Sequence, residues 1–351
     1  PPALPSLARS DSDVKDGSGV FYVQNVYDGP AELEPGSVKS LRVVRVDSQT
    51  TQTVPPRSTA LFETAKKILG TVPVAEDGSV AFRVPAGESL LFQLLDDNGM
   101  AVMGMRSFTY VHPGETVSCV GCHAPPNAPQ VRHGSLNELR VHDLHPPVGP
   151  KYDGGLSFAR TVQPVLDRYC ISCHGLDQTA GDMNLLGTIE DRPADAKNVL
   201  ASTAYNSLVS RDGLVAMALR NLETDASLPK DYFSHAGRLA GMLRSGDEHH
   251  QKLDPESLQR VVDWLDLNAQ FFGDYSWNKV EWRQPDPQGE STLRDHIREN
   301  FGAELAKQPY ASLVNVGEPT ESRILKAPLA TTAGGWGQID HNGWLSTKDS
   351  G

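Results

Sequence analysis

The chain has 351 residues, of which 38% are hydrophobic and 22% charged, and its formal net charge is -12 at neutral pH. This length allows two or three domains that each bury a core, and the composition is that of a globular protein. The negative charge disfavours nucleic acid or an anionic membrane surface as a partner, and favours a basic protein or a small neutral or cationic substrate. The sequence contains no apolar run of about 18 residues, the length that would predict a membrane-spanning helix.

The N-terminal third of the chain has the pattern of a β-domain. Residues 1–18 are rich in Pro, Ser and Asp and predict a flexible lead-in, and the β pattern occupies residues 19–123. Short runs of β-branched and alternating apolar residues, separated by Gly-containing turns, predict a small antiparallel sandwich. The predicted strands lie at about 20–27, 41–46, 80–84, 90–94 and 107–111.

All of the cysteines fall in two copies of one pattern. The copies are Cys119-Val120-Gly121-Cys122-His123 and Cys170-Ile171-Ser172-Cys173-His174. C-x-x-C-H is the attachment signature of c-type haem, in which two thiols bond the porphyrin and the adjacent histidine ligates iron. The sequence therefore predicts two covalently bound haem c groups, with His123 and His174 as proximal ligands.

Two other uses of paired cysteines fit the spacing less well. A zinc ribbon places its two C-x-x-C pairs about 15–20 residues apart, and Cys122 and Cys170 are farther apart than that. A thioredoxin-like dithiol needs no following histidine and follows a strand, whereas the second motif here follows a helical pattern.

Residues 124–155 are rich in proline and predict a linker, or a loop that wraps around the first haem. A helical domain of the cytochrome c type is then expected over 156–275, followed by a C-terminal extension over 276–351. Pro164 is expected to kink the first helix, and Asp254 to cap the helix that closes the domain. The predicted helices lie at 158–169, 235–243, 255–268 and 292–305. Together these elements predict an α+β multidomain protein, in which the sandwich carries haem 1 and the helical domain carries haem 2.

The second axial ligand of each iron determines whether that haem carries electrons or binds small molecules. For haem 2 we expect His249, in the loop before the closing helix, with His250 and then His235 as alternatives. Met242 is a further candidate, although its helical spacing from Leu239 favours a place in the core.

For haem 1 the candidate ligand is His112, just before the first motif. Met103 and Met105 lie on the preceding segment, where packing is the more common role of methionine. Tyr110 is expected in the core of the sandwich. Three histidines of the Pro-rich segment also remain open as ligands: His133, His142 and His145.

The chain resembles a known family. Residues 80–123 resemble the middle domain of hydrazine synthase alpha subunits, and residues 158–175, together with 264–268, resemble the cytochrome c domain that follows it. The middle-domain resemblance rests on the first haem motif and on two runs before it, Asn98-Gly99-Met100-Ala101-Val102 and Met105-Arg106-Ser107-Phe108-Thr109-Tyr110. The tail of related multidomain cytochromes is matched by two further runs, Ala327-Pro328-Leu329-Ala330 and Ala333-Gly334-Gly335-Trp336-Gly337.

This resemblance implies a bis-histidine second haem and an enzymatic first haem. In the synthase a tyrosine four residues after the first motif histidine is an axial ligand, and the motif histidine binds zinc. Asn127 stands at that tyrosine position in this chain, so ordinary ligation by His123 is expected instead. Family members also carry an upstream β-propeller that this sequence lacks, and we expect the chain to be a piece of a longer protein or assembly.

We predict an exported diheme cytochrome that transfers electrons between protein partners, at least one of them with a basic docking face. Covalent haem attachment outside the bacterial cytoplasm implies a periplasmic or extracellular location, reached through a signal that was removed or that belongs to a longer precursor. The alternative is a haem oxidoreductase in which haem 1 is open and haem 2 supplies it with electrons. A third hypothesis makes the sandwich a docking module.

Overall fold

The computed structural model describes residues 17–29, 32–47, 65–105, 107–122, 140–151, 153–176, 178–189, 201–217, 228–245, 253–273, 286–340 and 343–344. In these residues the fold is α+β, with two four-stranded sheets followed by helices. The strands are β1 (Ser18–Val23), β2 (Ser40–Val46), β3 (Lys66–Pro73), β4 (Val80–Pro85), β5 (Leu90–Leu95), β6 (Ala101–Gly104), β7 (Thr116–Cys119), β8 (Val141–His142), β9 (Ile339–Asp340) and β10 (Gly343–Trp344). The α-helices are α1 (Phe158–Thr161), α2 (Gln163–Tyr169), α3 (Thr203–Ser210), α4 (Phe233–Ala236), α5 (Arg238–Ser245), α6 (Pro255–Asp266), α7 (Pro287–Phe301), α8 (Ala303–Ala306), α9 (Tyr310–Leu313) and α10 (Arg323–Lys326).

The two sheets differ in strand direction. The sheet with order β3-β2-β5-β6 is antiparallel throughout, as the sequence predicts. In the sheet with order β7-β1-β4-β8, the edge strands β7 and β8 run parallel to their neighbours, so a purely antiparallel sandwich is wrong there. Parallel neighbours need long connections, and the chain passes through the other sheet before it returns to form β7.

The predicted strand over 107–111 is also wrong. Of that segment, only Thr109 pairs with the sheet, in an isolated bridge to Leu90. After the turn at Pro113-Gly114 the chain forms β7, which ends at Cys119. The first haem motif is therefore reached from a sheet edge, as expected, but from a later strand.

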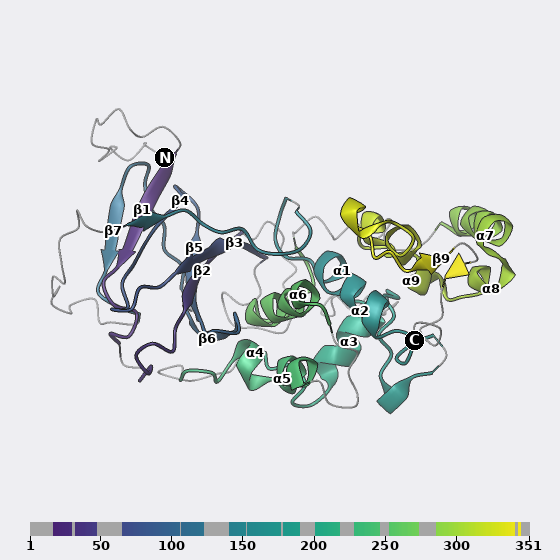
Figure 1. Cartoon of the computed structure of the whole chain (residues 1–351), viewed down its shortest axis with the longest axis horizontal. Helices are drawn as coiled ribbons and strands as arrows, with labels where there is room; N and C mark the ends of the chain where they lie inside the picture. The colour runs from purple at the N-terminus through teal and green to yellow at the C-terminus, as the bar shows by residue number, and fades with distance from the viewer. Residues whose placement is uncertain are drawn as a thin grey trace, which may run out of the picture.

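The sheet that contains β2 and β5 is buried on both faces. One face packs against the other sheet in a core that includes Phe82 and Phe92. The opposite face, with Val44 and Leu91, belongs to the same core as the helices. Every residue of β5 is buried, and this position explains its nearly continuous apolar sequence, since a strand covered on both faces loses polar alternation. Figure 1 shows this sheet between the β7-β1-β4-β8 sheet and helix α6.

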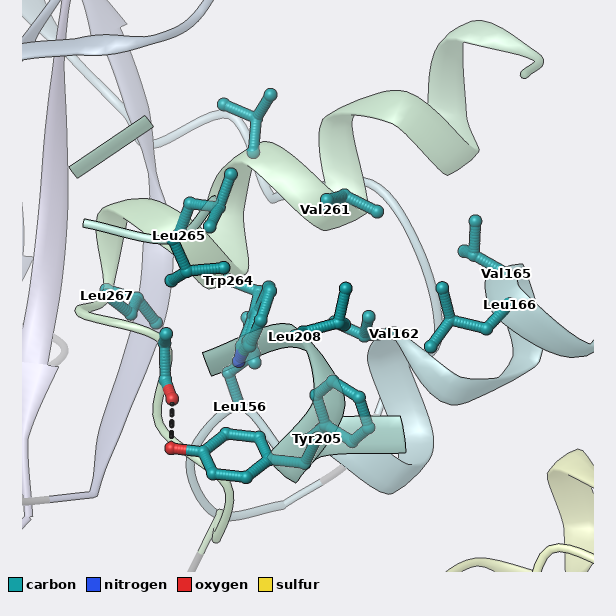
Figure 2. Packing of buried hydrophobic residues seen from close by; sticks show 14 of the residues in the cluster. Leu156, Val162, Val165, Leu166, Tyr205, Leu208, Val261, Trp264, Leu265 and Leu267 are labelled. Carbon is teal, nitrogen blue, oxygen red and sulfur yellow. Dashed lines mark hydrogen bonds between the residues drawn. The ribbon is translucent and has the colours of Figure 1, made fainter. Parts of the chain in front are cut away.

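The helical core is built around Trp264 of α6, which is fully buried (Figure 2). Helix α3, which the sequence analysis missed, contributes Tyr205, whose hydroxyl donates to the carbonyl oxygen of Ala269 at 2.9 Å. The expected kink at Pro164 is confirmed, because the helix is interrupted at Val162, between the end of α1 at Thr161 and the start of α2 at Gln163. Packing between α1 and α6 thus places α2 so that it leads directly into the second haem motif.

Helices α7 to α10 form a small group beside α1 and α2 (Figure 1). Arg160 of α1 forms an ion pair with Glu318, and the carbonyl oxygen of Ala159 accepts a hydrogen bond from Asn315. In the described ranges, no helix has the length and apolarity needed to cross a bilayer.

Asp254 caps α6 as the sequence predicts, and its carboxylate accepts from the backbone nitrogen of Ser257 at 2.8 Å. It also accepts from the Tyr169 hydroxyl at 2.7 Å, which ties α6 to the helix before the second motif.

We expect Asp254→Ala to lower the free energy of unfolding by about 1–2 kcal/mol, measured by urea denaturation. The control is Asp286→Ala, which removes the N-cap of α7 and should cost less; equal losses would show that the Tyr169 contact contributes nothing.

Candidate haem sites

The first motif lies on the edge strand β7 and is held by backbone hydrogen bonds to the end of β1. The carbonyl oxygens of Cys119 and Val120 accept from Gln24 and Asn25, at 2.9 and 3.2 Å. Gly121 is pressed against the turn that follows β1, since a Cβ there would lie 1.9 Å from the carbonyl oxygen of Asp28. The loop between the two cysteines therefore has a defined path. Both cysteines are partly buried against the core between the sheets.

A cavity of about 260 Å³ opens between the two sheets at this edge. One wall is the end of β7 with the two thiols of the first motif, and another is the segment around the end of β6. The lining residues are Val23, Leu41, Phe92, Leu94, Met103, Gly104, Met105, Ser107, Thr109, Cys119, Gly121 and Cys122. An apolar, concave site between sheets suits the flat hydrophobic face of a porphyrin.

Burial keeps these thiols protonated. It raises the pKa of Cys119 above its ordinary value, and burial together with the neighbouring Cys119 raises the pKa of Cys122 to about 12. A reactive dithiol needs a lowered pKa, whereas a thioether to haem carries no charge. The raised pKa values therefore argue against a reactive dithiol and are compatible with covalent haem attachment.

The second motif follows α2 as a tight turn. The backbone nitrogens of Cys173 and His174 both donate to the carbonyl oxygen of Cys170, at 3.2 and 3.0 Å. Ile171, between the two cysteines, is buried in the helical core. Nδ1 of His174 is buried and has no hydrogen-bond partner in the described residues. The turn brings the two cysteines and the histidine together in one short segment after α2, as attachment of a haem at the second motif would require.

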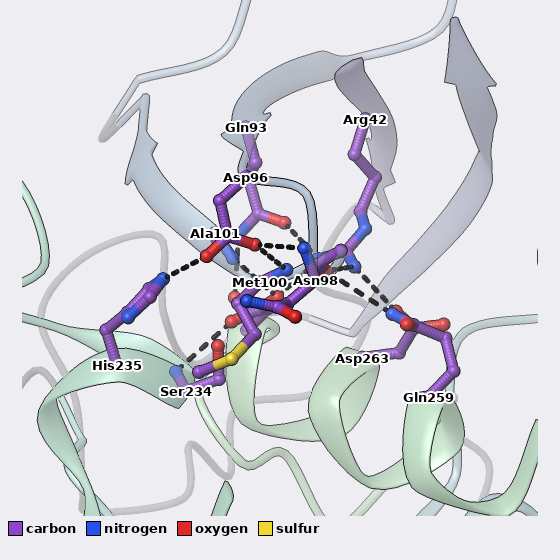
Figure 3. Close-up of polar contacts among 12 residues, drawn as sticks. Arg42, Gln93, Asp96, Asn98, Met100, Ala101, Ser234, His235, Gln259 and Asp263 are labelled. Atoms are coloured by element: carbon purple, nitrogen blue, oxygen red, sulfur yellow. Dashed lines mark hydrogen bonds and ion pairs between the residues drawn. The ribbon is translucent and has the colours of Figure 1, made fainter. Parts of the chain in front are cut away.

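The predicted partners of haem 2 are only partly located. His235, on α4, has its Nε2 3.1 Å from Oδ2 of Asp96, at the boundary between the helices and the sheet (Figure 3). Met242 of α5 packs against the helical core, as its spacing predicts. The first choice, His249, and its neighbour His250 lie outside the described residues.

The structure separates the candidate ligands of haem 1 into residues that line the cavity and residues that do not. Tyr110 is 53% exposed, so its expected place in the core is wrong; it lies beyond the Thr109 bridge, against the ring of His112. His112 is exposed and is not part of the cavity lining, whereas Met103 and Met105 are. The other histidines occupy the following places: His142 is in β8, His145 pairs with Thr71, and His123 and His133 lie outside the described residues.

A buried carboxyl group lies one turn before the second motif. Asp167 of α2 accepts a hydrogen bond from Gln163 at 2.8 Å, and Arg323 of α10 is the nearby cation. Burial, opposed by Gln163 and Arg323, raises the pKa of Asp167 to about 7. This carboxyl was missed in the sequence analysis because its burial depends on α10, far away in the chain.

The raised pKa predicts a pH dependence of stability. Because folding favours the protonated carboxyl, its full contribution is present below the unfolded pKa near 3.8 and is lost as pH rises through about 7. The wild type should therefore lose stability, on the order of a few kcal/mol, between pH 5 and pH 8. Urea denaturation of Asp167→Asn at both pH values should show a much smaller difference, and an unchanged difference would contradict this assignment.

Comparison with known proteins identifies the β-domain. Residues 36–124 match the family model of the hydrazine synthase alpha subunit middle domain. The chain is related to the hydrazine synthase alpha subunit. The curated subunit alpha from Kuenenia stuttgartiensis is 23% identical over an alignment that covers 58% of this chain. That alignment spans only 32% of the length of the Kuenenia protein.

The fold is also shared with a solved structure. The hydrazine synthase structure from Kuenenia stuttgartiensis superposes with a TM-score of 0.52 over 72% of this chain and 43% of that chain, at 19% identity. The superposition supports the arrangement of sheets and helices. The family-model match extends to residue 124 and so includes the whole first motif.

Proposed function

We propose that the chain is an exported diheme c-type cytochrome that transfers electrons between redox partners. The observation that carries the proposal is the apolar cavity at the first motif, which Cys119 and Cys122 help to line. The turn after α2, which holds Cys170, Cys173 and His174 together, supports a second haem. The relation to a haem-protein family supports both.

In this proposal each motif holds one haem. Cys119 and Cys122 bond haem 1 and His123 ligates its iron, while Cys170, Cys173 and His174 do the same for haem 2. Haem iron supplies reversible one-electron chemistry. The protein residues fix each haem in an apolar setting, keep water from it and, through the -12 net charge, favour a basic partner surface.

The same proposal includes the location and the domain organisation of the chain. We infer a periplasmic or extracellular location, and a sandwich (19–123) and a cytochrome c-like domain (156–275) joined by the Pro-rich segment 124–155. Residues 276–351 form an extension of the second domain. The chain is proposed to work as part of a larger protein or assembly, as the name of the Kuenenia subunit alpha suggests for that protein.

The second candidate is a haem enzyme with an open haem 1 supplied with electrons by haem 2. The relation to a synthase subunit favours it, as does the cavity beside the first motif. Asn127 at the position of the family's axial tyrosine argues against hydrazine synthesis itself. The two candidates differ in whether haem 1 keeps a free coordination position.

The electron-transfer proposal is tested by stopped-flow mixing of the reduced holoprotein with a small basic cytochrome and with a small acidic one. The basic partner should react faster, and its rate should fall steeply as salt is raised from 10 to about 200 mM, because screening removes the attraction. Equal rates with both partners, without salt dependence, would contradict a basic docking partner.

A further inference from the structure

Two methionines line the same cavity as the first pair of cysteines. Met103 and Met105 come from β6 and its end, while Cys119 and Cys122 come from β7 and the turn after it. These strands are edge strands of different sheets. The cavity therefore brings together the attachment residues of haem 1 from one sheet and two sulfur donors from the other.

Among the described residues, the cavity offers few other groups that can bind iron. Those residues contribute the hydroxyls of Ser107 and Thr109 besides the two thiols and the methionines. His112, the ligand that the sequence favoured, is exposed outside it. Methionine sulfur is an established axial ligand of c-type haem, and it raises the reduction potential relative to a second histidine.

The two methionines differ in how firmly they are packed. Met103 is paired with Leu94 in β6, is 4% exposed and belongs to the core between the sheets. Met105 follows the end of β6, is half-buried and contacts both the inter-sheet core and the helical core. Its backbone nitrogen still donates to the carbonyl oxygen of Phe92 at 2.9 Å, so the main chain is held while the side chain stays less confined.

We propose that Met105 is the second axial ligand of the iron of haem 1, and that Met103 packs against the haem without binding iron. The proposal rests on haem attachment at the first motif. A flexible, unbranched thioether can adjust to the iron once the haem is attached. Haem 1 is then six-coordinate, with the higher reduction potential of the two, and has no free position for a small-molecule substrate.

The test compares Met105→Leu with Met103→Leu in the full-length holoprotein, produced with a c-type haem maturation system. Haem content is first measured by the pyridine haemochrome assay, since the ligand proposal has meaning only with two haems per chain. The ferric wild type should show the near-infrared charge-transfer band of methionine-ligated haem. M105L should lose this band, bind cyanide at haem 1 and titrate at a lower potential, whereas M103L should keep all three wild-type properties.

Each other outcome overturns a distinct statement. Loss of the band in M103L but not in M105L overturns the choice between the methionines. A wild type with two haems and no methionine band overturns thioether ligation and leaves the diheme proposal intact. A wild type with no haem on the first motif overturns both.

A second measurement does not depend on whether M105L folds. In the reduced protein, where low-spin ferrous haem is diamagnetic, the ring current shifts the methyl NMR signal of a bound methionine far upfield. Wild type and M103L labelled with methyl-¹³C methionine should both show one such signal. A wild type without an upfield-shifted methyl signal would contradict the assignment to Met105. So would a signal that is present in the wild type and lost in M103L.

Discussion

Arg42→Met is expected to lower the free energy of unfolding by about 3–5 kcal/mol, because it leaves two buried carboxylates without their cation. Arg42 is 1% exposed in the middle of β2, on the face that meets the helices. Its guanidinium lies 2.6 Å from Asp263 Oδ1 and 2.8 Å from Asp266 Oδ2, both on α6 (Figure 3).

The effect should be large because the network joins the sheet to the helices. Gln93 of β5 accepts from Arg42 at 3.0 Å and donates to the carbonyl oxygen of Asp266 at 2.7 Å. Asp266 also accepts from the backbone nitrogens of Ala101 and Ser234, at 3.0 and 3.1 Å. Removing the cation therefore disturbs contacts among β2, β5, β6 and the helical region at once.

The matched control lies on the same strand. Arg45→Met breaks the partly exposed pair with Asp47, whose atoms are 2.7 Å apart, and should cost about 1 kcal/mol or less. Urea denaturation of both variants gives the comparison. The triple variant R42M/D263N/D266N should recover part of the loss, since it removes the unpaired charges. Equal losses for R42M and R45M would contradict the role given to this network.

Cys119→Ala/Cys122→Ala is expected to reduce the haem content from two per chain to one, because no thiol remains to bond haem 1. Cys170→Ala/Cys173→Ala should do the same for haem 2. Intact-protein mass spectrometry after acid denaturation detects only covalently bound haem and gives the count directly.

The two double variants serve as controls for each other. Each should keep the haem whose motif is intact, and their optical spectra should add up to that of the wild type. The first should lose the higher-potential haem and the second the lower-potential one. A wild type with no covalent haem, or a double variant that keeps both haems, would contradict the attachment of one haem at each motif.

Local patterns predicted much of the fold. Alternating apolar residues located β4 and most of β5, Pro164 predicted the break between α1 and α2, and Asp254 predicted the start of α6. These signals are short-range: proline restricts its own turn, and an N-cap acts within three residues.

Features that depend on distant contacts were not predicted. Strand β3 begins with Lys66 and Lys67 and contains Gly70, which weakens a strand signal. Gly70 is needed because a Cβ there would lie 2.4 Å from the carbonyl oxygen of His145. No local pattern marks Arg42 as buried, because the two carboxylates that pair with it lie more than two hundred positions later in the chain.

At the haem sites too, local sequence patterns were predictive and features built by distant segments were not. Contiguous motifs predicted the four haem-binding thiols; in the structure Cys119, Cys122 and Cys170 are partly buried and Cys173 is exposed. The cavity beside the first motif is made by β1, β2, β5, β6 and β7, so no single segment carries its pattern. For this reason the sequence favoured His112, a neighbour in the chain, over Met105, a neighbour in space.

Low-temperature EPR and optical spectra of the oxidised holoprotein, recorded before and after addition of cyanide and nitric oxide, test the central claim most directly. An electron carrier with two six-coordinate haems predicts two low-spin signals that do not change when either ligand is added. A high-spin signal that is converted on ligand addition would contradict this account and would favour an open, enzymatic haem 1.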